Sequence, residues 1–205
     1  MDASAKSLIA YGSLKLKDKA FLESAVALGE MEIDLARSVD GGQNKGLRTG
    51  KQLYGSFTYL FEPGKELLIE NRNINYFSRL DIGFTELDDY TESGDDDAVF
   101  YDDQLVKSAT LSLGFNYSGM INLEKAALTP LLKFELGKSK TINSLSEAYY
   151  INDASTIYAN AMADQNTFHG HLTLGLGASF KNNLNFNISF DHYRNNNDCL
   201  LYTSP

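Results

Sequence analysis

Apolar and polar residues alternate one by one from Phe168 to Phe190, interrupted only by a short polar stretch at Lys181–Asn183. The apolar positions include Leu172, Leu174, Leu176, Phe186, Ile188 and Phe190. The polar positions between them include His169, His171, Thr173, Asn185, Asn187 and Asp191. Successive side chains of a β-strand point to opposite faces, so this pattern predicts a β-hairpin with one apolar face and one polar face.

The same alternation recurs through most of the chain and predicts an antiparallel all-β fold. We expect eight strands, near residues 5–16, 21–37, 51–62, 67–85, 104–119, 124–138, 167–181 and 183–194. In the second of these the apolar positions change parity near Gly29 and Glu30, which predicts a β-bulge there. Several of the strands span at least ten residues, the length that a tilted strand needs to cross a bilayer.

The expected connections alternate in length along the chain. The short ones lie at 17–20, 62–66, 119–123 and 181–183, and the long ones at 38–50, 86–103 and 139–166. Outer-membrane β-barrels have this rhythm, with short turns on the periplasmic rim and long loops on the extracellular rim. Lipid cannot satisfy backbone hydrogen bonds, so only a closed β ladder crosses a bilayer as strands.

Composition limits the choice of function. The chain has 205 residues, is 43% hydrophobic and has a mean hydropathy of −0.28, which suits one domain with alternating strands. The net charge of −9 argues against nucleic acid as a partner, because phosphates would be repelled. Much of the acid lies in one segment, for which we expect a solvated loop in preference to a divalent-cation site: Glu86, Asp88, Asp89, Glu92, Asp95, Asp96 and Asp97.

The last seven residues, 199–205, have a different origin in our interpretation. Their sequence, CLLYTSP, resembles the translation of a transposon-end sequencing adapter, and such segments are excluded from fold reasoning. We therefore expect residues 1–198 to be a partial domain, and we draw no redox conclusion from Cys199, the single cysteine.

Five short motifs, in order, extend over nearly all of residues 1–198. They are Tyr11–Leu14 (YGSL), Leu28–Val39 (LGEMEIDLARSV), Tyr54–Phe57 (YGSF), Leu128–Glu135 (LTPLLKFE) and Leu174–Phe180 (LGLGASF). Each motif is weak alone, but their order and spacing resemble the C-terminal β-domain of autotransporters, the type V secretion proteins.

The resemblance implies a fold, partners and a location. Domains of this family are twelve-stranded transmembrane barrels with a helix in the pore, and they end in an aromatic residue that the barrel-assembly machinery recognises. By this comparison we expect a fragment truncated at both ends, with about eight strands of the meander present. The implied function is to translocate a passenger domain and anchor it in the outer membrane, in contact with lipid and the barrel-assembly machinery.

Residue by residue, the sequence predicts no catalytic, cofactor-binding or metal site, and we expect no enzyme activity. His169 and His171 lie two residues apart on the polar face, but the sequence fixes no third ligand, and His192 on the next strand does not supply one. Ser13 and Ser56 lack the context of a nucleophile elbow.

For four charged residues the sequence predicts a location in the barrel but no catalytic or binding role. We expect Arg79, Lys133 and Glu135 to form a charge network on the polar, lumen-lining face, and Arg37 to lie at the rim.

Two other functions remain open at this stage. One is a small self-contained outer-membrane barrel, an adhesin or porin-like protein whose loops bind ligands. The other is a soluble β-sandwich or carrier, which would place the apolar residues in a closed core and the polar residues outside.

Overall fold

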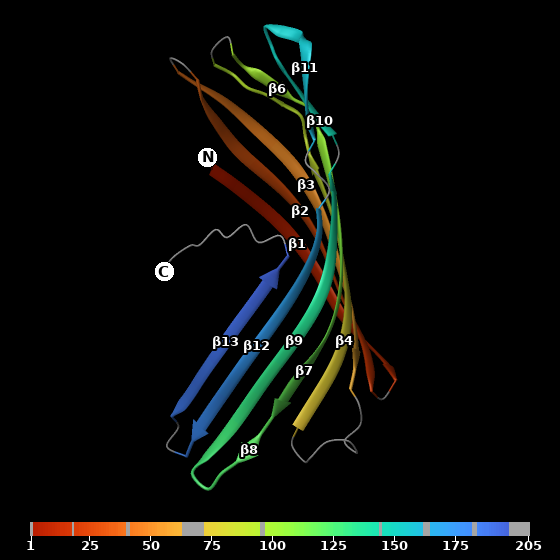
Figure 1. Ribbon diagram of the computed structural model, residues 1–205, viewed down its shortest axis with the longest axis vertical. Coiled ribbons are helices and arrows are strands. Elements are labelled where there is room, and N and C mark those ends of the chain that lie inside the picture. Colours follow the sequence, from red (N-terminus) through yellow and green to blue (C-terminus); the bar gives the residue numbers. More distant parts are fainter. Residues whose placement is uncertain are drawn as a thin grey trace.

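The computed structural model describes residues 2–17, 19–39, 42–62, 72–94, 97–143, 145–161, 165–181 and 184–196. Its main sheet is a meander of long antiparallel strands that follow one another in chain order (Figure 1). These strands are β1 (Asp2–Lys17), β2 (Ala20–Val39), β3 (Gly42–Phe61), β4 (Arg72–Leu87), β7 (Gln104–Gly119), β9 (Ala126–Asn143), β12 (Gln165–Phe180) and β13 (Asn185–Asn195). The short β8 (Ile121–Asn122) pairs with β9. All eight predicted strands are confirmed, and residues 67–71 and 183 of the predicted ranges lie outside the described residues.

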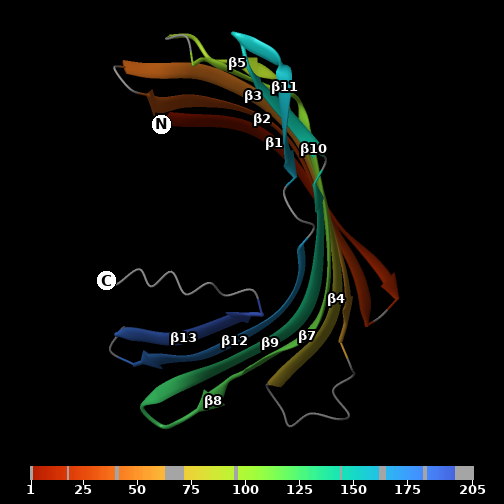
Figure 2. The same ribbon diagram turned by 45° about the horizontal axis from the view of Figure 1, so that its top comes forward.

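The sheet curls into an open half-barrel, as Figure 2 shows. Its two faces differ as the alternation predicts. Large apolar side chains are exposed on one face, with Leu113 59% and Phe186 57% exposed. On the other face Ser112, His169 and Thr173 are buried. Side chains on the inside of a curl crowd one another, so the polar face is the inner face and the apolar face is the outer one.

Within the described residues, β13 pairs only with β12 and β1 only with β2, so the sheet has two edges. The apolar side chains of the β12–β13 hairpin lie on the outer face, as predicted, and do not enter a closed core. They are Leu172, Leu174, Leu176, Phe186, Ile188 and Phe190. No second sheet covers that face among the described residues. The soluble sandwich is therefore excluded.

Two predictions about β2 and β3 are wrong. Residues 38–50 are not a long loop, because β2 and β3 pair in unbroken register from Ala20 with Phe61 to Val39 with Gly42. The register also passes Gly29 and Glu30 without a bulge. Above Gly29 the outer face carries Glu30 and Glu32, and the half-buried inner face carries apolar side chains such as Ile33. The hairpin therefore continues beyond the apolar zone with its polarity reversed.

Two of the long connections carry strands of their own. These are β5 (Tyr90–Thr91) and β6 (Val99–Tyr101) between β4 and β7, and β10 (Leu145–Tyr150) and β11 (Asp153–Ala161) between β9 and β12. They form a four-stranded sheet in the order β11-β10-β6-β5. We call it the rim sheet. It lies at one end of the half-barrel, beside the ends of β2 and β3 (Figure 1).

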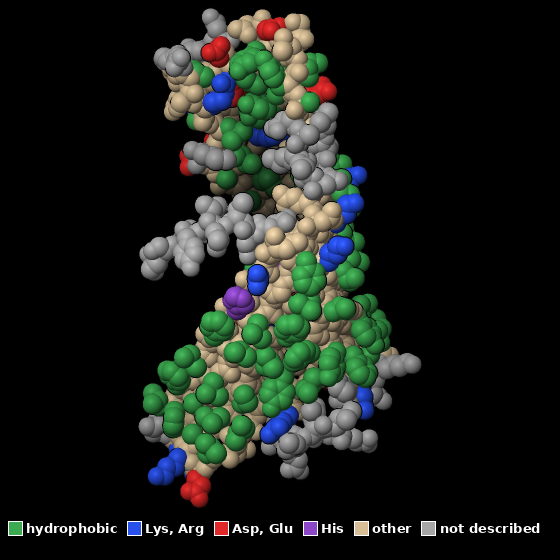
Figure 3. All heavy atoms as spheres, in the orientation of Figure 1, with side chains coloured by type: hydrophobic (Ala, Val, Ile, Leu, Met, Phe, Trp, Pro, Cys, Tyr) green, Lys and Arg blue, Asp and Glu red, His purple; other side chains and the backbone are tan. Residues whose placement is uncertain are grey.

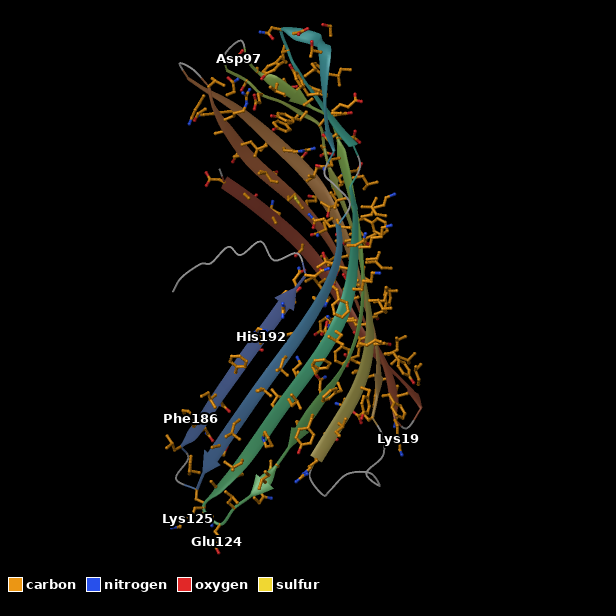
Figure 4. The ribbon with its side chains drawn as sticks, viewed as in Figure 1. Lys19, Asp97, Glu124, Lys125, Phe186 and His192 are labelled. Carbon is orange, nitrogen blue, oxygen red and sulfur yellow. The ribbon has the colours of Figure 1, made fainter. Side chains whose placement is uncertain are left out.

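The two ends of the half-barrel are distinct in Figure 4. Lys19, Glu124 and Lys125 mark the end with short turns, and Asp97 marks the end with the rim sheet. No described residue belongs to a helix that is long and apolar enough to span a membrane.

Candidate functional site

The inner face carries a charge network that joins β3, β4 and β9. Arg79 of β4 donates from Nε to Asp81 Oδ2 at 3.0 Å and from Nη2 to Glu135 Oε1 at 2.5 Å. Both carboxylates are largely buried, with 15% and 14% of their side chains exposed, against 34% for Arg79. One guanidinium therefore neutralises two acids that come from different strands.

Asp81 extends this network to β3. Its Oδ1 accepts a hydrogen bond from the Tyr54 hydroxyl at 2.7 Å and another from Ser56 Oγ at 2.6 Å. Tyr54, Ser56, Arg79 and Asp81 all have the polar parity of their strands, and the register of β3 with β4 sets Ser56 directly beside Asp81. The carboxylate thus has donors on both sides.

His169 extends the network to β12. Its ring lies directly over Gly137, where a Cβ atom would collide with Cε1 and Nε2 of the imidazole. Only glycine leaves room for the ring at this point, and its Nε2 then lies 3.7 Å from Glu135 Oε1. His169 is 8% exposed, so the polar face is closely packed here.

A second polar cluster lies farther along β12 and β13. Thr173 donates to Asp191 Oδ1 at 2.6 Å, and His171 Nε2 lies 3.4 Å from the same oxygen. The ring of Tyr193 lies against both His169 and His171, with centroid distances of 5.7 and 6.2 Å. Lys133 pairs with Thr173 across the β9–β12 ladder.

The structure therefore brings most of the predicted residues together. Arg79, Lys133 and Glu135 share the inner face, as expected, and Arg79 contacts Glu135. His169 and His171 share that face, but His192 lies on the outer face with its ring stacked on Phe190. Among the described residues, no three His, Cys, Asp or Glu side chains gather as a metal site would require.

A second ionic site fixes the rim sheet to the inner face of β2. Arg37 donates from Nε to Glu92 Oε1 at 3.0 Å and from Nη2 to Glu92 Oε2 at 2.6 Å. The Val99 amide donates to Glu92 Oε2 at 3.1 Å. Burial by itself raises the pKa of Glu92, but the hydrogen bonds from Arg37 and Val99 outweigh it and hold this pKa below its usual range.

Arg48 of β3 makes the second attachment. It donates from Nε to the Asp88 carbonyl at 2.9 Å and from Nη2 to the Asp102 carbonyl at 3.0 Å. Its guanidinium also lies 5.6 Å from the ring centroid of Tyr90. Burial, together with the nearby Tyr101 and Glu92, raises the pKa of Tyr90 to about 12.

These contacts correct the prediction for the acidic segment. Glu92 is only 6% exposed and is a buried partner of Arg37, so it does not belong to a solvated loop. Asp95 and Asp96 lie outside the described residues. Arg37 lies at the rim as predicted, but its partner was missed. The change of parity in β2 was the available signal, because it places Arg37 on the apolar inner side of that hairpin.

Comparisons with known proteins give a family match and distant structural similarities. The family model for the autotransporter beta-domain matches residues 1–191. No curated protein matches the chain. Similar solved structures include the ferric yersiniabactin uptake receptor FyuA from Yersinia pestis, with 8% identity over 86% of this chain and 27% of that chain and a TM-score of 0.49.

Two others are receptors from Acinetobacter baumannii. The siderophore receptor PiuA has 9% identity over 94% of this chain and 42% of that chain, with a TM-score of 0.43. The ferric preacinetobactin receptor BauA has 10% identity over 97% of this chain and 35% of that chain, with a TM-score of 0.42. The chain spans less than half the length of all three receptors.

The family model covers almost the whole sequence and agrees with the one-sided antiparallel sheet. The chain therefore belongs to the autotransporter beta-domain family, and it lies in the outer membrane of a Gram-negative bacterium.

Proposed function

We propose that this chain forms part of the wall of a conduit through which an attached passenger domain reaches the cell surface, and that it then anchors the passenger in the outer membrane. The observation that carries the proposal is the inner face, where a polar network runs from Tyr54 on β3 to His169 on β12. An unfolded segment in transit has unpaired backbone groups, and a polar wall offers them hydrogen-bond partners that lipid cannot.

In this proposal the work of the domain is mechanical. Arg79 binds two carboxylates, and Asp81 accepts hydrogen bonds from Tyr54 and Ser56, so these side chains hold one another in place on the wall. Such a network keeps the wall polar and fixed in shape, and it needs no catalytic residue. Nothing in the proposal requires a cofactor.

Site-specific photo-crosslinking in the full-length protein tests the conduit. A photoreactive residue replaces Lys133 on the inner face, and in a matched variant it replaces the adjacent Leu132 on the outer face. The passenger is halted in transit by a folded insert, in cells of a Gram-negative host. We expect Lys133 to crosslink to the passenger and Leu132 to crosslink to lipid. Equal passenger crosslinking at both positions, or none at Lys133, would reject the conduit.

We also propose that the barrel-assembly machinery inserts the domain into the membrane. Membership of the autotransporter beta-domain family supports this proposal. A physical argument supports it too, since long strands with an apolar outer face need help to enter a bilayer as a closed ladder. Depletion of the machinery should reduce the amount of folded, heat-modifiable protein in outer-membrane fractions. An unchanged folded fraction would mean that insertion follows another route.

A further inference from the structure

Four basic side chains form a row across the outer face from β7 to β13, at the margin of its apolar zone nearest the rim sheet. On β7 and β9 they have the parity of Leu111 and Leu136, and the register pairs Lys138 with Leu111 and Lys140 with Ala109. The four residues, which we call the basic margin, are Lys107, Lys138, Lys140 and Arg194. All are exposed, and Figure 3 shows Lys and Arg side chains along the upper border of the apolar area.

On β1 to β4, basic side chains at the same height on the outer face have carboxylates opposite them, whereas those of the basic margin do not. There, Lys6 pairs across the ladder with Glu30, and Lys51 pairs with both Glu30 and Glu86. By the same measure, no member of the basic margin lies directly opposite a carboxylate on a neighbouring strand of the described sheet. A chain with a net charge of −9 thus presents uncompensated positive charge at one place on its lipid-facing side.

An apolar groove begins directly below this charge. It has a volume of about 560 Å³ and is open along the outer face. Its lining includes Leu111, Leu113, Phe134, Leu136 and Phe168, and Lys138 forms its upper end. Phe168 pairs with Lys138 across the β9–β12 ladder and is 51% exposed. The groove therefore continues the surface that faces lipid and ends at a cation.

We propose that the groove and the basic margin form a binding site for one phosphate-bearing lipid of the extracellular leaflet, with an acyl chain along the groove, its phosphate at Lys138 and Lys140, and Lys107 and Arg194 on either side. The rim sheet and the long connections place this end of the strands on the extracellular side. Clustered basic side chains at a membrane boundary bind anionic headgroups, and the apolar groove supplies the contact that an inorganic anion lacks.

Native mass spectrometry of the full chain, folded in detergent micelles, tests this site. The probe is bisphosphorylated lipid A, and its dephosphorylated form is the reference. The test variant is Lys138→Gln/Lys140→Gln. The matched control is Lys6→Gln/Lys51→Gln, which removes the same charge from the balanced side of the sheet. We expect the test variant to weaken lipid A binding by about tenfold or more, and the control to change it by less than about twofold.

Two further arms separate the contributions of headgroup and chain. Loss of the phosphates should weaken binding to the wild-type chain about as much as loss of the two lysines does, and inorganic phosphate should not displace the lipid. Equal weakening in the test and control variants, or undiminished binding of dephosphorylated lipid, would overturn the proposal. Complete displacement by inorganic phosphate would show an anion site without a lipid and would also overturn it. A melting curve for each variant confirms that it is folded.

Discussion

Arg79 is the cation that compensates the buried acids of the inner face. Its two partners, Asp81 and Glu135, are less exposed than Arg79 itself. Removal of the guanidinium would leave both carboxylates close together without a counter-charge. The loss of stability would therefore come mainly from the buried carboxylates left without a counter-charge. This cost is reduced because about a third of the Arg79 side chain is open to solvent.

We expect Arg79→Gln to lower the free energy of unfolding by about 1–3 kcal/mol, in a urea titration of the full chain in lipid. Arg79→Lys should fall between this variant and the wild type, because an ammonium group cannot bridge both carboxylates as a guanidinium does. If Arg79→Gln were as stable as the wild type, the network would not contribute to stability.

Leu174 tests the assignment of the outer face to lipid. It lies near the middle of the apolar part of β12, so Leu174→Lys should destabilise the protein by about 2–4 kcal/mol in the same titration. Thr173 is a poor control because its buried hydroxyl donates to Asp191. Asn187 is exposed on the inner face, and Asn187→Lys should cost much less. Equal costs would mean that the faces are not lipid and lumen.

Strand parity was sufficient to predict the faces of these residues but not their contacts. Arg79 and Glu135 lie 56 positions apart, and parity alone places both on the inner face. Their contact depends on the registers of β4 with β7 and of β7 with β9, which set Arg79 beside Ser112 and Ser112 beside Gly137. The long connection between β4 and β7 and the short one between β7 and β9 have no distinctive sequence pattern that would fix these registers.

At the scale of the strands, the attachment of the rim sheet to β2 and β3 should depend on pH. The folded-state pKa of Glu92 is lowered, so its stabilising contribution is complete above the ordinary value of 4.5 and is lost as the pH falls through the lower folded value. Arg37 stays protonated over this range. Acid should therefore release the attachment at β5 and β6 before it unfolds the main sheet.

Hydrogen exchange of peptides from residues 88–103 measures this release, after correction for the intrinsic pH dependence of exchange. We expect protection of the Val99 amide to fall below about pH 4.5 in the wild type. Glu92→Gln should show weak protection at all pH values. Equal pH profiles for the two proteins would show that the ion pair does not hold the rim sheet.

The same elements explain why one strand boundary could not be predicted. A change of parity is produced either by a bulge or by a change in the medium outside an unbroken strand. In β2 the second cause applies, because the outer face meets lipid below Gly29 and water above it. A hydrophobic pattern without a known membrane boundary does not separate the two causes, so the hairpin extension at 38–50 was predicted as a loop.

At the scale of the whole molecule, the structure predicts an orientation in the membrane. The rim sheet should face the outside of the cell, and the turn at Glu124 and Lys125 should face the periplasm (Figure 4). An epitope tag inserted after Asn152, between β10 and β11, should bind antibody on intact cells. A tag inserted after Glu124 should bind only after the outer membrane is permeabilised. The reverse result would invert the assignment.

The strand order of the main sheet also bears on the kinetics of folding. Every long strand pairs with its neighbours in the chain, so this part of the ladder can grow hairpin by hairpin without a large loop-closure cost. The rim sheet is different, since β6 pairs with β10 across an interval that contains all of β7 and β9. Its central pairing must close this longer interval, so we expect the rim to be completed later than the wall formed by β1 to β4.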